Sequence, residues 1–235
     1  MAGAKAKNLD LTEGVIWKQL LRFLLPIAVG TLFQQLYNTV DAVIVGQFVG
    51  SDALAAVGGS SAMIVQFLVG IFTGLSSGAT VVISHGYGAD DRLKLERAVH
   101  TAVAFAVVAG ALITAIGLLA APWALEVTKN PADIMADSTR YLRLYFIGIV
   151  PMMVFNMGSG ILRAVGDAKR PLYYLVFCCL VNIVLDLLFV AAIPLGVAGA
   201  AIATTIANLL SAILIVRQLV RTQDSYRLVL RQVRI

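Results

Sequence analysis

The chain has 235 residues, of which 60% are hydrophobic and 13% are charged, and its mean hydropathy is +0.89. Ordinary soluble domains are far more polar, so this composition excludes a soluble globular protein and predicts an integral membrane protein. The net charge of +5 does not indicate nucleic-acid binding, because a basic recognition face needs polar surface that this chain does not have. We therefore expect membrane lipid, and no nucleic acid, among its partners.

Apolar runs long enough to cross a bilayer recur along the whole sequence. A helix needs roughly 20 mostly apolar residues to span about 30 Å of hydrocarbon. Barrel strands are ruled out because they alternate over about ten residues, whereas these runs are apolar on every face. The sequence thus predicts an all-α membrane protein with six transmembrane helices, at about residues 20–45, 59–83, 98–121, 142–162, 171–193 and 196–216.

The basic residues predict the orientation of these helices. If the N-terminus is cytoplasmic, only Lys129, Arg140 and Arg143 of the 18 basic residues fall outside. The positive-inside rule then places both termini in the cytoplasm, with 217–235 as a basic tail or linker, and predicts a multi-pass protein of the plasma or inner membrane. The basic residues expected on the cytoplasmic side are Lys5, Lys7, Lys18, Arg22, Arg92, Lys94, Arg97, Arg163, Lys169, Arg170, Arg217, Arg221, Arg227, Arg231 and Arg234.

Two acidic residues stand out because they fall at membrane depth. Of the 13 acidic residues, only Asp41 and Asp186 are expected there. A carboxylate at the bilayer centre costs at least about 2.5 kcal/mol, so such residues usually face a cavity or a partner. We therefore interpret both aspartates as functional.

Polar neighbours reinforce this interpretation. Gln34, Asn38 and Asp41 have the spacing i, i+4, i+7, which places them on one helical face with Tyr37 beside it. Asn182 also shares a face with Asp186, four residues on. The alternative is that these groups only join helices by hydrogen bonds, which we prefer for Asn208 and Ser211 of the sixth helix.

Other chemistries find little support in the sequence. Cys178 and Cys179 are adjacent in one predicted helix, and we interpret them as apolar fillers rather than a disulfide or metal site. His85 and His100 lack a third ligand and are interpreted as interfacial polar residues. The turns "GYGADD" and "AVGDAKRP" lack the Lys-Ser/Thr ending of a phosphate loop. No constellation of nucleophile, base and oxyanion donors is visible, so we do not expect an enzyme.

Four long stretches together resemble one transporter family. These are "LLPIAVGTLFQQLYNTVDAVIVGQFVGSDALAAVG", "GLSSGATVVISHGYGADD", "GSGILRAVGDAKRP" and "VNIVLDLLFVAAIPLGVAGAAIAT". They resemble, in the same order and at similar spacing, the N-terminal half of MATE (multidrug and toxic compound extrusion) transporters. Several long motifs in series are far more specific than a single short pattern.

The resemblance implies roles for particular residues. In similar prokaryotic transporters, the aspartate of "YNTVD", the asparagine and aspartate of "NIVLD" and the threonine of "GAAIAT" line a cation-coupling pocket. Here these residues are Asp41, Asn182, Asp186 and Thr204, whose hard oxygen ligands suit H⁺ or Na⁺ as the coupling ion, with no other cofactor expected. Further candidates for the wall of a substrate cleft are Gln34, Tyr37, Asn38, Tyr141, Met153 and Asn156.

The same resemblance implies a missing half. Transporters of this family carry twelve helices in two lobes of six, related by a pseudo-two-fold axis, and this sequence matches one lobe. We therefore expect a second six-helix lobe, either another copy of this chain or a separate C-terminal half. The implied activity is antiport, in which inward flow of a cation drives a small organic, often cationic, drug or toxic compound outward by alternating access.

Two alternatives remain open. A lipid or lipid-linked glycan flippase of a related family shares this architecture but has a strongly basic cleft, whereas no Lys or Arg is expected at membrane depth here. A non-transporting split or truncated fragment is the other alternative, and nothing in the sequence distinguishes it from half of an active transporter.

Overall fold

The computed structural model describes residues 15–229 and 231, except the side chain of Ile16. Lys5, Lys7 and Arg234, which the sequence analysis places in the cytoplasm, lie outside these residues. In the described part of the chain all regular structure is helical. The helices are α1 (Ile16–Phe48), α2 (Ser51–Gly58), α3 (Ser60–Gly88), α4 (Arg92–Val127), α5 (Met135–Ile147), α6 (Ile149–Ala164), α7 (Lys169–Asp186), the π-helix η1 (Leu187–Ala192) and α8 (Val197–Arg221).

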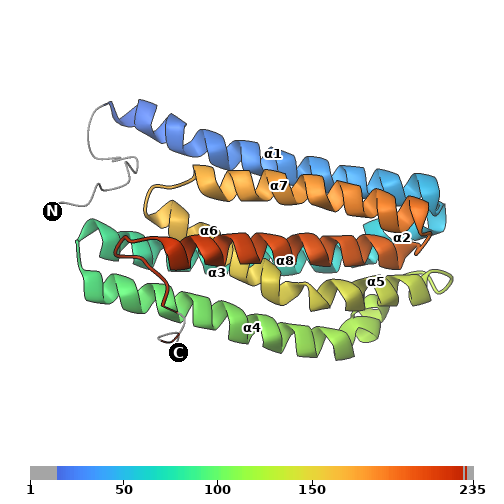
Figure 1. Ribbon diagram of the computed structural model, residues 1–235. Coiled ribbons are helices and arrows are strands. Elements are labelled where there is room, and N and C mark those ends of the chain that lie inside the picture. Colours follow the sequence, from blue (N-terminus) through green and yellow to red (C-terminus); the bar gives the residue numbers. More distant parts are fainter. Residues whose placement is uncertain (1–14, 230, 232–235) are drawn as a thin grey trace.

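These helices form an up-and-down bundle of membrane-spanning segments. Within the described residues, five helices are long and apolar enough to cross a bilayer. The pair α5 and α6 makes a sixth if it is counted as one bent span. The predicted all-α membrane fold is thus confirmed. Because the number of crossings is even, α1 begins and α8 ends at the same end of the bundle (Figure 1).

The fourth predicted span, 142–162, is broken rather than continuous. Helices α5 and α6 meet at an angle of 48°, with Gly148 between them. Pro151, in the first turn of α6, lacks a backbone N–H, and its ring would clash with the carbonyl of Ile147 in a continuous helix. Pro151 is tolerated where it stands because the first turn of a helix does not need that N–H.

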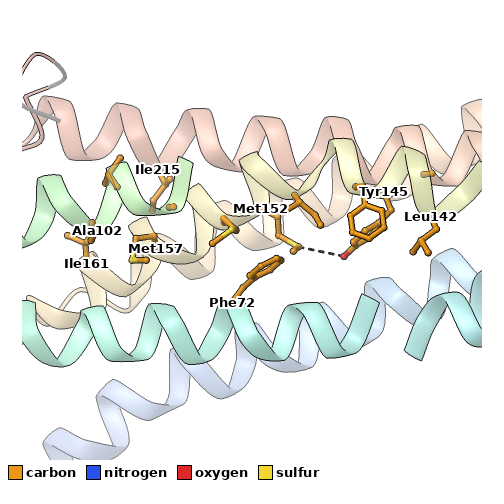
Figure 2. Packing of buried hydrophobic residues seen from close by; sticks show 14 of the residues in the cluster. Phe72, Ala102, Leu142, Tyr145, Met152, Met157, Ile161 and Ile215 are labelled. Atoms are coloured by element: carbon orange, nitrogen blue, oxygen red, sulfur yellow. Dashed lines mark hydrogen bonds between the residues drawn. The ribbon is translucent and has the colours of Figure 1, made fainter. Parts of the chain in front are cut away.

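Helix α6 is the centre of the bundle, packed against α3, α4 and α8. Glycines permit this close approach. A Cβ on Gly158 would lie 2.6 Å from the Ile215 side chain of α8, and one on Gly160 would lie 2.6 Å from Ser76 Oγ of α3. Small residues at helix contacts are how membrane helices gain packing energy without a strong hydrophobic drive. Figure 2 shows the apolar cluster that results, with Phe72 and Met157 within it.

Helix α1 is different, because it packs chiefly against α7 and only slightly against α8. Helix α7 in turn packs against α8, so the α1–α7 pair is joined to the rest of the bundle mainly through α8, with smaller contacts through α2 and η1. After η1, the turn at 193–196 reverses the chain and leads into α8. Gly196 takes φ +61° there, in the left-handed region that favours glycine.

Candidate functional site

A cavity of about 310 Å³ lies between the α1–α7 pair and the helices α3, α6 and α8. Its apolar lining includes Phe155 of α6 and Leu172 and Leu175 of α7. Amides and hydroxyls are interspersed with these apolar groups. Apolar and polar groups contribute about equally to the lining, so the cavity can cover the apolar part of an organic molecule and bind its polar groups.

Most of the polar residues singled out in the sequence line this cavity. The α1 stripe contributes Gln34, Tyr37 and Asn38, and α6 contributes Asn156. The coupling candidates that line it are Asn182 of α7 and Thr204 of α8.

Two cleft candidates lie elsewhere. Tyr141 and Met153 are 6% and 3% exposed and belong to the apolar core rather than to the cavity lining. Met153 Sδ would lie 3.4 Å from a Cβ on Gly110 of α4, which shows that it packs toward α4. Met152, the residue before it, lines the cavity instead. The bend between α5 and α6 sets which methionine faces inward, and the sequence alone did not reveal that bend.

Asp41 and Asp186 are buried beside each other, behind the cavity wall. They are 8% and 0% exposed, and neither lines the cavity itself. Their carboxyl groups are close enough to interact directly. Asp41 comes from the C-terminal third of α1, and Asp186 is the last residue of α7 before η1 begins. The packing of α1 along α7 therefore brings together two carboxylates 145 positions apart in the sequence.

The oxygens of this cluster lack partners within the described residues. Asp41 Oδ1, Asn182 Oδ1 and both carboxylate oxygens of Asp186 are buried and accept no hydrogen bond there. Asn182 Nδ2 donates to Thr204 Oγ1 over 3.5 Å, which turns the amide oxygen of Asn182 away from that hydroxyl. Buried polar atoms normally have partners, so orphaned oxygens from three residues form a site that suits a bound cation.

The backbone that follows Asp186 forms the π-helical turn η1, which helps to position this cluster. The π-helical turn that follows Asp186 is wider than an α-turn, and such turns occur often at functional sites. Its end packs against the start of α8, where a Cβ on Gly199 would lie 2.8 Å from the Phe189 carbonyl oxygen. This contact holds α7 close to α8, and with it Asn182 close to Thr204.

Tyrosines surround the aspartates on the side of α5. Tyr37, Tyr141 and Tyr145 all lie close enough to Asp41 to interact with it electrostatically. The Tyr145 hydroxyl points toward Met152 and donates to its sulfur over 3.6 Å (Figure 2). The sequence analysis missed Tyr145 and Met152, although both line the cavity, because no periodic polar pattern marks them.

The cysteines and histidines do not add a metal site. Cys178 and Cys179 are free, buried thiols that line the cavity. Within the described chain, no group of three or more His, Cys, Asp or Glu residues is placed to hold a metal ion. His100 is buried and structural. Its Nδ1 contacts the Glu96 carbonyl over 2.6 Å, and its Nε2 accepts from the Val229 N–H over 3.0 Å.

The bundle and its cavity define an all-α integral membrane protein with a cavity between its helices. The MatE family model matches residues 26–188, and the chain therefore belongs to the MATE family. Over 202 residues it is 31% identical to "Probable multidrug resistance protein YpnP" of Bacillus subtilis, covering 86% of this chain and 45% of that protein. A second Bacillus subtilis relative, "Probable multidrug resistance protein YoeA", is 30% identical over 83% of this chain and 42% of that protein.

Solved structures agree with this assignment. The structure described as the "Outward-facing conformation of a multidrug resistance MATE family transporter of the MOP superfamily" superposes with a TM-score of 0.89 at 28% identity. The match covers 98% of this chain and 51% of that one. This chain thus spans about half the length of the relatives it matches. Those relatives are transporters and not enzymes, as the sequence predicted.

Proposed function

We propose that this chain forms one six-helix lobe of a cation-coupled antiporter that exports small organic molecules. The observation that supports the proposal is the buried pair Asp41 and Asp186, whose oxygens, like the amide oxygen of Asn182, are buried without hydrogen-bond partners among the described residues. Two adjacent carboxylates in a low-dielectric site repel each other when both are charged. Binding of H⁺ or Na⁺ relieves that repulsion.

The cation and the organic molecule would occupy neighbouring sites. Asn182 and Thr204 line the cavity, and Asn182 also belongs to the cluster around Asp186. A cation held there would thus act on the cavity wall through one shared side chain. Since α1 carries Asp41 and packs mainly on α7, cation binding would bias how α1 sits against the bundle, with Pro26 as a place to bend. Inward flow of one charge supplies about 2.3 kcal/mol per 100 mV.

A second lobe belongs to this proposal because of the α1 surface. Gln34, Gln35 and Asn38 line the cavity and are also exposed, so the cavity is open along a helix that spans the membrane. Polar groups facing hydrocarbon are costly, so a protein surface rather than lipid is expected to cover them. Either a second copy of this chain or a separate C-terminal half would serve. The mass of the purified 25.0 kDa protein, corrected for detergent, distinguishes a dimer from a monomer that awaits another chain.

The test is transport by the protein reconstituted in liposomes with its second lobe. Asp41→Asn and Asp186→Asn remove a negative charge while keeping the shape, and each is expected to abolish dye movement driven by a proton or sodium gradient. Asp52→Asn is the matched control, because Asp52 is exposed in α2 and should leave transport intact. Comparing a pH gradient with a sodium gradient identifies the coupling ion. If Asp41→Asn still moved the dye against its gradient, the mechanism would be wrong.

A further inference from the structure

The cavity carries one charge of its own, and it is positive. Arg163 lies in the last turn of α6 and lines the cavity, whereas no Asp or Glu does so among the residues that the structure describes. From the sequence, Arg163 is expected on the cytoplasmic side of the membrane. The structure places it at the α6–α7 end of the cavity, near Ala168 and Pro171, which line the same space.

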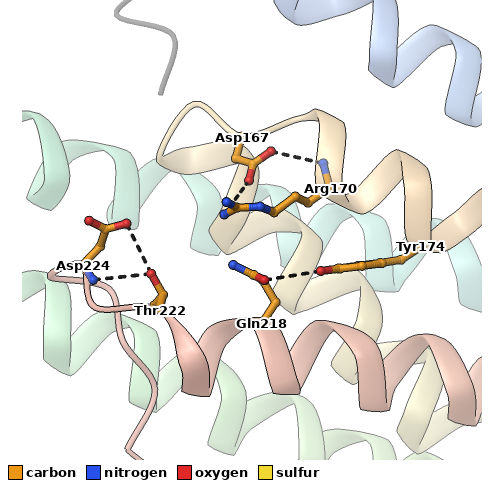
Figure 3. A network of polar contacts seen from close by, with 6 residues as sticks. All are labelled: Asp167, Arg170, Tyr174, Gln218, Thr222 and Asp224. Carbon is orange, nitrogen blue, oxygen red and sulfur yellow. Dashed lines mark hydrogen bonds and ion pairs between the residues drawn. The ribbon is translucent and has the colours of Figure 1, made fainter. Parts of the chain in front are cut away.

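Arg163 has no acidic partner in the described part of the chain. The nearest acidic residue along the sequence, Asp167, is engaged elsewhere. Its Oδ2 lies 3.1 Å from Arg170 Nη1, and its Oδ1 accepts from the Arg170 backbone N–H over 3.1 Å (Figure 3). A half-buried guanidinium without a counter-charge is unfavourable unless something else supplies one.

A second unpartnered group lies one helical turn away. Ser159 is 3% exposed and lines the same cavity, yet its Oγ makes no hydrogen bond among the described residues. Helical Ser and Thr side chains in membranes usually bond to the carbonyl four residues earlier. Thr80 does so with Ser76 O over 2.8 Å. The Ser159 hydroxyl can therefore donate a hydrogen bond to a molecule in the cavity.

The spacing of these groups suits one oxygen anion. Asn156, Ser159 and Arg163 follow one face of α6 at i, i+3 and i+7. Ser159 and Arg163 are separated by about 6 Å along the helix axis, which a guanidinium and a hydroxyl can bridge onto a single carboxylate or phosphate. Asn156 Nδ2 already donates to Met152 O over 3.0 Å, so the free donors are those of Ser159 and Arg163.

We infer that Arg163 and Ser159 form an anion-binding subsite for the carboxylate or phosphate group of an amphipathic molecule. The apolar wall of Phe155, Leu172 and Leu175 would hold the rest of that molecule. Neither Asp41 nor Asp186 lines the cavity, and Arg163 forms no ion pair with either of them. The inference rests on the proposed function in taking this cavity as the one that the exported molecule enters, and it narrows the substrate class to anions and zwitterions.

Binding of a fluorescent probe to the purified 235-residue protein in detergent tests the subsite. The probe is a dansyl-labelled undecanoic acid, and its methyl ester is the neutral twin. The wild-type protein is expected to bind the acid at least about tenfold more tightly than the ester, because a charge-assisted hydrogen bond is lost with the ester. Arg163→Gln should lower the affinity for the acid to that for the ester. Ser159→Ala should weaken binding of the acid about threefold or more.

Matched variants separate the subsite from general effects. Arg217→Gln removes the same charge from an exposed position on α8 outside the cavity, and Ser61→Ala removes another buried, unpartnered hydroxyl that does not line it. Both should keep the preference for the acid. Unchanged binding of the ester by Arg163→Gln shows that the cavity still folds, and Arg163→Lys should retain part of the preference.

Three results would overturn the subsite. The first is equal binding of acid and ester by the wild-type protein, and the second is equal loss of both in Arg163→Gln. The third is a change in the mass of the assembly in Arg163→Gln while the preference persists, since Arg163 would then contact the second lobe.

Two further measurements settle the source of the anion and its relation to transport. In nanodiscs, competition by added phosphatidic acid identifies a lipid headgroup as the natural anion. Lack of competition excludes this headgroup and leaves a soluble amphipathic molecule as the source, while the preference of the wild-type protein for the acid supports the subsite in either case. Because no ion gradient is used, a protein that binds the acid selectively but fails to transport would overturn the antiporter and leave the subsite standing.

Discussion

Helices α1 and α8 are both long and apolar, but they differ in how much of their surface other helices cover. In the most apolar 18-residue stretch of each helix, 6% of α1 is buried against 50% of α8. Helix α8 packs against α5, α6 and α7 through small residues, whereas α1 leans mainly on α7. The difference teaches that hydropathy selects membrane helices without saying which of them are held by protein.

The same contrast locates the site. The cavity opens between the α1–α7 pair, of which α1 is the least buried helix, and the helices packed around α6. The contact pattern thus sets α1, which packs mainly on α7, apart from the helices that pack around α6 and α8. The variants below probe this division, from the largest expected effect to the smallest.

The direct test compares one leucine from each helix. Leu219 of α8 is 1% exposed, and Leu219→Ala is expected to lower the free energy of unfolding by about 2–5 kcal/mol through a cavity in the core. Leu25 of α1 is 66% exposed, and Leu25→Ala should change it far less. Unfolding in mixed detergent, followed by circular dichroism, measures both. Equal losses would mean that α1 is packed as firmly as α8.

Two glycines test the same packing by adding side-chain volume instead of removing it. A Cβ on Gly117 of α4 would meet the Phe146 ring at the bend between α5 and α6, whereas one on Gly74 of α3 meets nothing within 4 Å. Gly117→Val is expected to cost about 1–3 kcal/mol by overpacking. Gly74→Val should cost little beyond helix propensity. Thermal unfolding midpoints in detergent measure both effects. A larger loss of stability in Gly74→Val than in Gly117→Val would contradict the packing described.

The segment after α8 extends the packed side and can be tested separately. Tyr226 and Leu228 are buried, and the Val229 N–H donates to His100 Nε2 of α4. His100→Leu leaves that N–H without its acceptor, which should cost about 1–2 kcal/mol and speed amide exchange at Val229. Exposed His85 of α3 provides the control, because His85→Leu should leave Val229 protected. Unchanged exchange in His100→Leu would show that the contact does not hold the segment.

The smallest effect is expected at the exposed start of α4. The backbone N–H of Lys94 donates to Asp91 over 3.1 Å and holds the pKa of that carboxyl below its ordinary value. The cap therefore stabilises the fold fully above the ordinary aspartate pKa of about 3.9, and the contribution is lost as pH falls through the lower folded-state pKa.

Two variants of Asp91 make this measurable. Asp91→Ala should give a small loss of stability at neutral pH that fades in acid, whereas Asp91→Ser should retain most of the cap without that pH dependence. Thermal unfolding of the three proteins across pH 3–7 is the measurement. A loss that stayed constant across this range would remove the carboxylate from the explanation.

The sequence by itself determined that this protein lies in a membrane, and it singled out many of the polar residues in and around the cavity. Runs of about 20 apolar residues allow only membrane helices, because every backbone group must be satisfied within each segment. Two aspartates at membrane depth were conspicuous for the same reason. Periodicity placed Gln34 with Asn38 on one face of the first helix, and the structure brings both to the cavity.

Only the tertiary structure decided which side chains meet. Local periodicity carries no information on the contact between α1 and α7 that joins Asp41 to Asp186, nor on the bend that turns Met152 rather than Met153 inward. Arg163 gives the clearest case, since a basic residue at a helix end looks like a cytoplasmic anchor in sequence. Whether such a side chain faces water or a cavity depends on the neighbouring helices, and packing between distant segments sets their positions.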